Sequence, residues 1–184
     1  MIEMMAREWE EELIAEWLSL QGYLVQTNVP LRAPKVGGRA EADVIGVKAL
    51  SDGRLEIWHI EIGSLLDSFE KNLERIKNKF SEERCDAVIK YVKLTLGEAR
   101  EIANYRKTFV ATYCSRVEEL GKMLKKEETG IELLLLQDIV KQEIPTTIHQ
   151  WKERQEKIGL VKDRRNIVLP RSYWLLKVIE LLLR

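Results

Sequence analysis

The stretch Gly37–Gly63, GGRAEADVIGVKALSDGRLEIWHIEIG, constrains the fold of this chain more than any other segment. Its pattern predicts two strands, over residues 39–48 and 54–62, joined by a turn at Ser51–Gly53. Apolar residues occupy both faces near the middle of each strand, which is typical of a central sheet covered by helices. The stretch therefore predicts a buried β-hairpin.

Carboxylates interrupt both strands at positions where a buried strand is normally apolar. Because side chains alternate along a strand, Glu41 and Asp43 share one face of the first strand. By the same alternation, His59 and Glu61 share one face of the second. Asp43 and Glu61 lie near the ends of neighbouring strands, so we expect them to converge on one point. Oxygen ligands of this kind suit a hard cation such as Mg²⁺.

Apolar periodicity outside the hairpin predicts alternating helices and strands. We expect helices over residues 2–20, 65–80, 95–104, 117–125 and beyond 138, and strands over residues 23–27, 86–92, 108–113 and 131–136. This order predicts an α/β fold with a mixed central sheet flanked by helices. It divides into an α/β domain over residues 1–136 and a helical C-terminal extension over 137–184. The extension is expected to pack back on the domain or to lie at a dimer interface.

Composition narrows the function classes. Thirty Lys and Arg residues balance thirty Asp and Glu residues, which disfavours a protein that coats nucleic acid but allows a local basic face. Cys85 and Cys114 lie in apolar surroundings, which favours buried free thiols and a cytoplasmic location. No apolar run approaches the roughly 20 residues of a membrane span. No zinc-binding or phosphate-loop pattern occurs either.

The element order and the acidic strands resemble the PD-(D/E)XK, or restriction-endonuclease-like, nuclease superfamily, and within it the archaeal Holliday junction resolvases. The resemblance covers roughly residues 8–92. EADVIG at Glu41–Gly46 is similar to the family's acidic strand and maps its metal-binding Asp to Asp43. HIEIG at His59–Gly63 is similar to the E-x-K strand and maps the second carboxylate to Glu61.

A third acid is expected in the first helix. In the resolvases a Glu stands about three turns before the glycine that ends this helix, and counting back from Gly22 gives Glu11, with Glu12 beside it. The resemblance implies hydrolysis of DNA, double-stranded or branched, with Mg²⁺ or Mn²⁺ as cofactor. Asp43, Glu61 and the backbone carbonyl of Ile62 would be the metal ligands. A homodimer is also implied, since resolvases cut two symmetric strands.

The sequence departs from the family at one position. The family's lysine is expected two residues after Glu61, and Gly63 stands there. Candidate replacements are Lys71, Lys77, Arg39 and Lys48, and we assign the catalytic role to Lys71 although the sequence leaves the others open. Two alternatives follow. The chain is a catalytically inactive DNA-binding or assembly module with the nuclease fold, or it is an unrelated α/β interaction domain with structural acids.

Several other residues have a simpler structural interpretation. His59 is expected to be a hydrogen-bonded packing residue, which is the commoner role of a lone strand histidine. Trp9, Trp17 and Trp58 are expected in the core. The basic residues from Lys152 onward are diluted by acids, so a solvated face is the default and phosphate binding the alternative.

Overall fold

The computed structural model describes residues 2–31, 40–159 and 167–182, with side chains from residue 9 onward. The strands are β1 (Leu24–Pro30), β2 (Glu41–Ala49), β3 (Leu55–Leu65), β4 (Ile102–Cys114) and β5 (Ile131–Leu135). The helices are α1 (Ile2–Leu20), α2 (Phe69–Lys79), α3 (Glu82–Leu96), α4 (Val117–Lys126), α5 (Leu136–Asp138), the π-helix η1 (Ile139–Glu143), α6 (Ile144–Lys157) and α7 (Trp174–Leu182).

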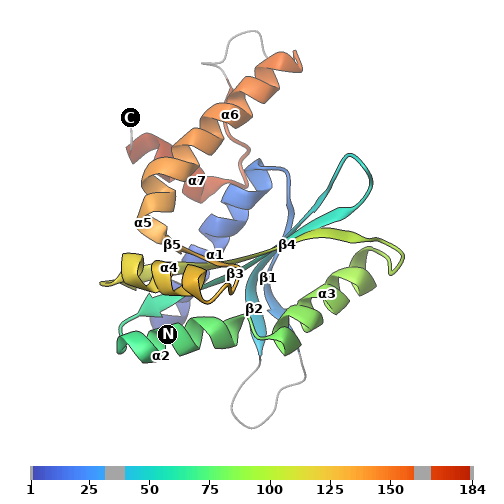
Figure 1. Ribbon diagram of the computed structural model, residues 1–184. Helices are drawn as coiled ribbons and strands as arrows, with labels where there is room; N and C mark the ends of the chain where they lie inside the picture. The colour runs from blue at the N-terminus through green and yellow to red at the C-terminus, as the bar shows by residue number, and fades with distance from the viewer. Residues whose placement is uncertain (1, 32–39, 160–166, 183–184) are drawn as a thin grey trace.

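The five strands form one mixed sheet in the order β1-β2-β3-β4-β5. The pairs β1–β2 and β2–β3 are antiparallel, and the pairs β3–β4 and β4–β5 are parallel. Helices flank this sheet, with α2 and α3 on one side and α1, α6 and α7 on the other (Figure 1). The predicted α/β class, a mixed sheet flanked by helices, is confirmed.

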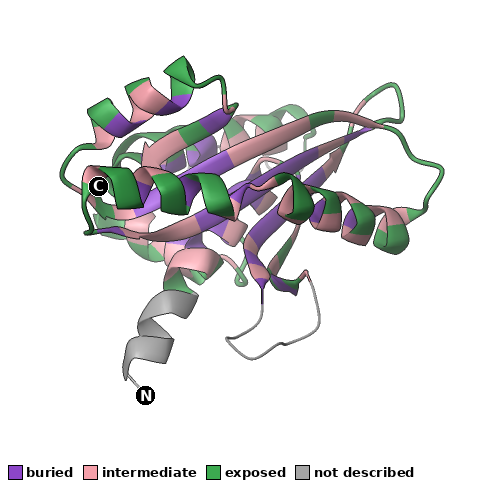
Figure 2. Ribbon diagram, turned by 60° about the horizontal axis from the view of Figure 1, so that its bottom comes forward, coloured by how far each residue is buried: buried purple, intermediate pink, exposed green. Residues whose placement is uncertain are grey.

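Side-chain alternation along the central strands gives each helical layer its own core. Val44 and Ile60 pack toward α1. Ile45 and Ile57 pack toward α3 on the opposite face. Buried residues run along the middle of the strands beneath the helices (Figure 2). The two-sided apolar pattern of the hairpin strands is thereby explained.

The predicted hairpin is present as β2 and β3, with Ile45 opposite His59. Its turn is closed by Asp52, whose carboxylate accepts the backbone N–H of Arg54 at 3.0 Å. Gly53 follows with a φ of +84°, a conformation that other residues rarely adopt. β3 continues to Leu65, beyond the predicted end at residue 62.

The prediction of a strand over residues 86–92 is wrong, because these residues lie within α3. Val88 and Val92 are four residues apart and both are buried, so the apolar spacing is that of a helix face. The predicted helix over 95–104 is also wrong. Gly97 ends α3 with a φ of +109°, and β4 begins at Ile102.

The C-terminal helices complete the core on the α1 side of the sheet. Ile144, Ile148 and Leu176 are buried with residues of α1. The Trp17 indole N–H donates to the Thr147 hydroxyl at 3.0 Å. Helices α6 and α7 therefore pack on the α/β layer, while the alternative of a dimer interface stays a prediction. Among the helices that the structure describes, none has the length and apolar character of a membrane span.

Three tryptophans were predicted to lie in the core. Trp17 and Trp58 are buried, as expected. Trp9 is 40% exposed, so its prediction as a core residue is wrong. Among the residues of α1 whose side chains the structure describes, the first buried one is Leu13, where the helix meets the sheet and the C-terminal helices.

Candidate functional site

Asp43 and Glu61 come together where β2 and β3 leave their paired region. The last bridged pair is Val44 with Ile60, so the two acids lie just beyond it on adjacent strands. Asp43 Oδ2 accepts the backbone N–H of Ile62 at 2.7 Å. The Glu61 side chain is fully buried and that of Asp43 is 18% exposed. The predicted convergence of these two carboxylates is therefore present.

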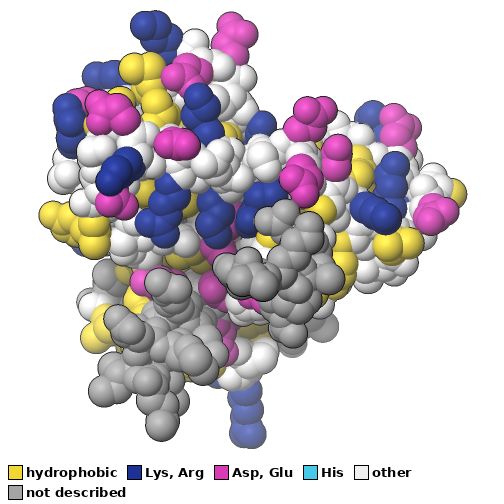
Figure 3. Space-filling view, turned by 90° about the horizontal axis from the view of Figure 1, so that it is seen from below, with side chains coloured by type: hydrophobic (Ala, Val, Ile, Leu, Met, Phe, Trp, Pro, Cys, Tyr) yellow, Lys and Arg dark blue, Asp and Glu magenta, His cyan; other side chains and the backbone are white. Residues whose placement is uncertain are grey.

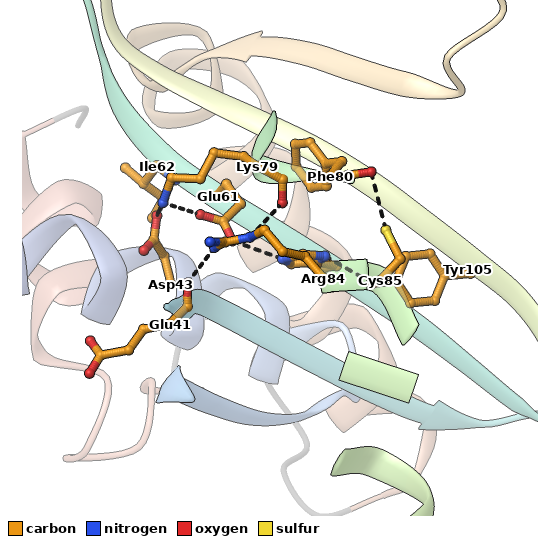
Figure 4. Close-up of polar contacts among 10 residues, drawn as sticks. Glu41, Asp43, Glu61, Ile62, Lys79, Phe80, Arg84, Cys85 and Tyr105 are labelled. Carbon is orange, nitrogen blue, oxygen red and sulfur yellow. Dashed lines mark hydrogen bonds and ion pairs between the residues drawn. The ribbon is translucent and has the colours of Figure 1, made fainter. Parts of the chain in front are cut away.

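Lys79, the last residue of α2, bridges the two carboxylates (Figure 4). Its ammonium donates to Glu61 Oε2 and lies 3.7 Å from Asp43 Oδ2. Lys79 is absent from the four basic residues that the sequence suggested. It is the basic side chain that the structure places directly between the predicted acids.

Arg84, in the first turns of α3, supplies a second cation. Its guanidinium donates to Glu61 Oε1 at 3.0 Å and to the backbone carbonyl of Glu41 at 2.6 Å. Its Nε donates to the Lys79 carbonyl at 3.0 Å, which ties the end of α2 to the start of α3. The junction of these two helices thus holds both cations over the carboxylates.

His59 joins Glu61 to the neighbouring strand. The ring is fully buried, with Nε2 at 2.9 Å from Glu61 Oε1 and Nδ1 at 2.9 Å from the Tyr105 hydroxyl. An ionised carboxylate only accepts, so Nε2 donates to Glu61, and the Tyr105 hydroxyl is the partner of the second ring nitrogen. His59 is thus a hydrogen-bonded packing residue, as predicted, and it also orients Glu61.

The two acids differ in how readily they take a proton. Burial and the nearby Glu61 carboxylate raise the pKa of Asp43 to about 6, against the opposing charge of Lys79. Burial also acts to raise the pKa of Glu61, but the His59 hydrogen bond and the Lys79 charge outweigh it and hold that pKa below its usual value. Glu61 is thus the ionised member of the pair, and Asp43 is the member that titrates near neutrality.

Arg75 of α2 occupies the space over Gly63. A Cβ built at Gly63 would lie 3.3 Å from Arg75 Nη2 and 3.7 Å from the Phe109 ring. Arg75 Nη1 donates to the Ser64 carbonyl at 3.0 Å. A guanidinium from the helix therefore lies against the strand position at which the family's lysine would begin.

The four basic candidates from the sequence fall in different places. Lys71 lines a pocket of about 420 Å³ together with Lys79 and Arg84. Lys77 pairs with Glu127 at 2.8 Å. Lys48 donates to the Gln21 carbonyl at 3.0 Å, near the end of α1. Arg39 lies outside the described residues. Of the three that are described, Lys71 alone shares a pocket with the site.

The other predicted acids do not join Asp43 and Glu61. Glu11 accepts the Asn28 amide at 2.6 Å, and Asn28 lies level with Asp43, between the bridged pairs Thr27–Val44 and Val29–Ala42. Glu12 accepts the Trp174 indole N–H at 3.1 Å. The Glu41 carboxylate points away from Glu61 (Figure 4). In the described part of the chain, no three or more His, Cys, Asp or Glu side chains group to hold a metal ion.

Comparison with family models, with curated proteins and with solved structures gives no significant match. The chemistry of the site therefore rests on its geometry. The pair Asp43–Glu61 and the Ile62 carbonyl offer oxygen donors, which suit Mg²⁺ or Mn²⁺. Burial and the neighbouring Glu61 carboxylate raise the pKa of Asp43 although Lys79 is near, and a cation on this carboxylate would oppose both effects. The donor set thus fits a divalent cation.

Proposed function

We propose that this protein is a metal-dependent nuclease of the PD-(D/E)XK type that hydrolyses phosphodiester bonds in DNA. The observation that carries the proposal is the placement of Lys79 between Asp43 and Glu61. Two converging carboxylates and one ammonium are the groups that the superfamily resemblance implies. Here the ammonium comes from α2 instead of from β3.

The fold supports the same proposal. Helix α1 precedes an antiparallel arrangement of β1, β2 and β3, and helices then lead to the parallel strand β4. The acids lie on β2 and β3, the second and third strands of the sheet. A restriction-endonuclease-like core is our interpretation of this topology.

The proposed metal ligands are Asp43, Glu61 and the Ile62 carbonyl. These residues would hold a Mg²⁺ ion, which when bound would supply polarisation of a phosphodiester oxygen and a lowered pKa of an attacking water. Because the Ile62 N–H bonds to Asp43, the carbonyl of the same strand residue faces the same edge. Glu61 is oriented by His59, so this ligand stays ionised and fixed in position.

Lys79 takes the place of the family lysine in this proposal. Its side chain is 27% exposed, so the ammonium can reach both the carboxylates and a phosphate that approaches from solvent. Beside the reacting phosphate it stabilises the negative charge that develops in the transition state. When Lys79 moves toward the phosphate, the ion pair with Arg84 still balances the charge of Glu61.

The second candidate function is a catalytically inactive DNA-binding module. One observation favours it: both oxygens of Glu61 already accept hydrogen bonds, from His59 and Arg84 on one side and Lys79 on the other. If these contacts persist in the presence of Mg²⁺, Glu61 is a structural charge and the protein binds DNA without cutting it.

A cleavage assay separates the two functions. Supercoiled, single-stranded and branched DNA are incubated with the protein in Mg²⁺ or Mn²⁺, beside Asp43→Asn, Glu61→Gln and Lys79→Ala. We expect each substitution to lower the cleavage rate by about 10²-fold or more, because each removes a group that acts on the transition state.

The matched control is Lys77→Ala, because Lys77 lies on the same helix two residues away and pairs with Glu127. It should cut at the wild-type rate. Cutting that survives both Asp43→Asn and Glu61→Gln would reject the assigned site. DNA binding without cutting by the wild-type protein would favour the inactive module.

A further inference from the structure

Helix α2 carries a row of cations that leads into the candidate site. Lys71, Arg75 and Lys79 are spaced four residues apart, so they lie along one side of the helix. Each step rises about 6 Å along the helix axis. Lys79 at the end of the row contacts Asp43 and Glu61, which leaves Lys71 and Arg75 outside the carboxylate pair.

The pocket beside this row is strongly basic. Its volume is about 420 Å³, and its lining comprises four cationic side chains and one carboxylate: Lys71, Arg75, Lys79, Arg84 and Glu74, with Asn78. The face that carries α2 and α3 shows several Lys and Arg side chains side by side across its middle (Figure 3). A local excess of positive charge exists although the whole chain is formally neutral.

The cations of the row differ in their partners. Lys79 and Arg84 pair with Glu61, and Lys77, on the other side of α2, pairs with Glu127. Within the described residues, no carboxylate lies within ion-pair distance of Lys71 or Arg75. Arg75 donates to the Ser64 carbonyl, an acceptor that carries no formal charge. Lys71 and Arg75 thus offer charge to an anion from outside the chain.

We propose that Lys71 and Arg75 bind the phosphates that neighbour the one at the carboxylates, so that α2 is a track for one polynucleotide strand. The inference rests on the proposed function for the identity of the polyanion. Both cations are exposed side chains of one helix. Their stride of about 6 Å suits successive phosphates of an extended single strand.

The test measures binding without cleavage. Fluorescence anisotropy follows a labelled single-stranded oligonucleotide of about 12 nucleotides, a common site size, in EDTA at several KCl concentrations. Lys71→Ala should reduce the slope of log affinity against log salt by about 0.7, which is about a fivefold loss of affinity at 0.1 M KCl. Arg75→Gln should have a similar effect.

Lys77→Ala is the control, because it removes the same charge from the opposite side of α2. It should change the affinity by less than about twofold, since that charge is already paired and screened. Equal losses in Lys71→Ala and Lys77→Ala, or no binding by the wild-type protein, would overturn the proposal. Tighter binding of a duplex with the same dependence on Lys71 would overturn the assignment to a single strand.

These outcomes are independent of the nuclease activity. If no DNA is cut in Mg²⁺ or Mn²⁺ but Lys71→Ala and Arg75→Gln lose affinity and Lys77→Ala does not, the track stands and the nuclease proposal falls. If DNA is cut and the cutting depends on Asp43 and Glu61, but Lys71→Ala binds DNA with the wild-type affinity, the nuclease proposal stands and the track falls.

Discussion

Glu61 is a buried carboxylate that is ionised because neighbouring donors and cations lower its pKa. His59, Lys79 and Arg84 all donate to it, and each comes from a different element. Burial without such donors would favour the neutral acid. The cost of burying this charge is therefore offset by a network that also fixes the carboxylate in one orientation, which is the property that a metal ligand needs.

Asp43 is expected to make the stability of the protein depend on pH. Its ordinary pKa is 3.8 and its folded value is about 6, so between these values the folded protein binds the proton more tightly than the unfolded chain. Through Asp43 alone, the free energy of unfolding therefore falls as pH rises from about 4 to about 6 and stays lower above that range, by a total of about 3 kcal/mol. Urea denaturation in EDTA at pH 4, 5.5 and 7.5 measures it.

The control is Asp43→Asn, which can still accept the Ile62 N–H through its amide oxygen. This variant lacks the titration, so it should be about 3 kcal/mol more stable than the wild-type protein at pH 7.5 and similar to it at pH 4. A stability difference that does not change with pH would contradict the assignment. Mg²⁺ should stabilise the wild-type protein at pH 7.5 and leave Asp43→Asn unaffected.

The residue Gly63 gives a second prediction about a single position. If Lys79 replaces the family lysine, Lys79→Ala should lower the cleavage rate by about 10²–10³-fold. Adding Gly63→Lys should recover at least about tenfold of that loss, because it returns an ammonium to the strand. Arg75, the nearest group, has an exposed side chain that can shift. Gly63→Met, which adds length without charge, should recover nothing in the same plasmid-nicking assay.

The sequence was sufficient to predict that Asp43 and Glu61 converge and insufficient to predict that Lys79 lies between them. Carboxylates at the end of two apolar strands are conspicuous, and strand alternation fixes the face on which they lie. Helix α2 holds Lys71, Lys77 and Lys79, and only the angle at which α2 meets the sheet decides which of them reaches the acids. That angle depends on tertiary packing, and Lys71 was selected without it.

At the scale of elements, the contact between α1 and the sheet depends on a glycine. A Cβ at Gly46 of β2 would lie 3.1 Å from Leu18 Cδ1 and 3.2 Å from Tyr23 Cδ1. Both neighbours are buried and have little room to move. Gly46→Ala should therefore lower the free energy of unfolding by about 1–2 kcal/mol through overpacking.

Gly121 of α4 is the matched control for this substitution. A Cβ there would meet nothing within 4 Å. Gly121→Ala should stabilise the protein by about 0.5–1 kcal/mol, because alanine favours the helix. Urea denaturation of both variants gives the comparison, and a loss of stability in Gly121→Ala as large as in Gly46→Ala would contradict the packing argument.

Element assignment from sequence failed at α3 for a physical reason. The segment DAVIKYV is rich in β-branched and aromatic residues, which favours a strand. It also places Val88 and Val92 one helical turn apart, and the acidic residues Glu82 and Glu83 follow Ser81 at a helix start. The helix bonds and the packing of both valines against the sheet outweigh the strand preference.

On the scale of the whole molecule, helices α6 and α7 are part of the main core. Leu176 is fully buried among residues of α1 and the sheet. Leu176→Ala should lower the free energy of unfolding by about 2–5 kcal/mol while unfolding stays a single transition. Leu182→Ala, on the same helix but 78% exposed, should change it by less than about 0.5 kcal/mol.

Tryptophan fluorescence and far-UV circular dichroism should report the same midpoint for Leu176→Ala. Two separated transitions would mean that the C-terminal helices unfold independently of the sheet. The Glu16 carboxylate argues for one unit, since it accepts the N–H of Leu176 at 3.0 Å and so anchors the start of α7 to the C-terminal part of α1.

The contact between α1 and α7 can form only late in synthesis, because the two helices are far apart in the sequence. The ribosome releases α1 first, whereas Leu176 emerges roughly 10–30 s later at common elongation rates. Until then the apolar side of α1 that α7 covers lacks its native packing contacts. The Glu16 carboxylate also lacks the two backbone N–H donors of α7. The nascent chain is therefore most exposed to aggregation or chaperone capture along α1, and that exposure ends when α7 docks.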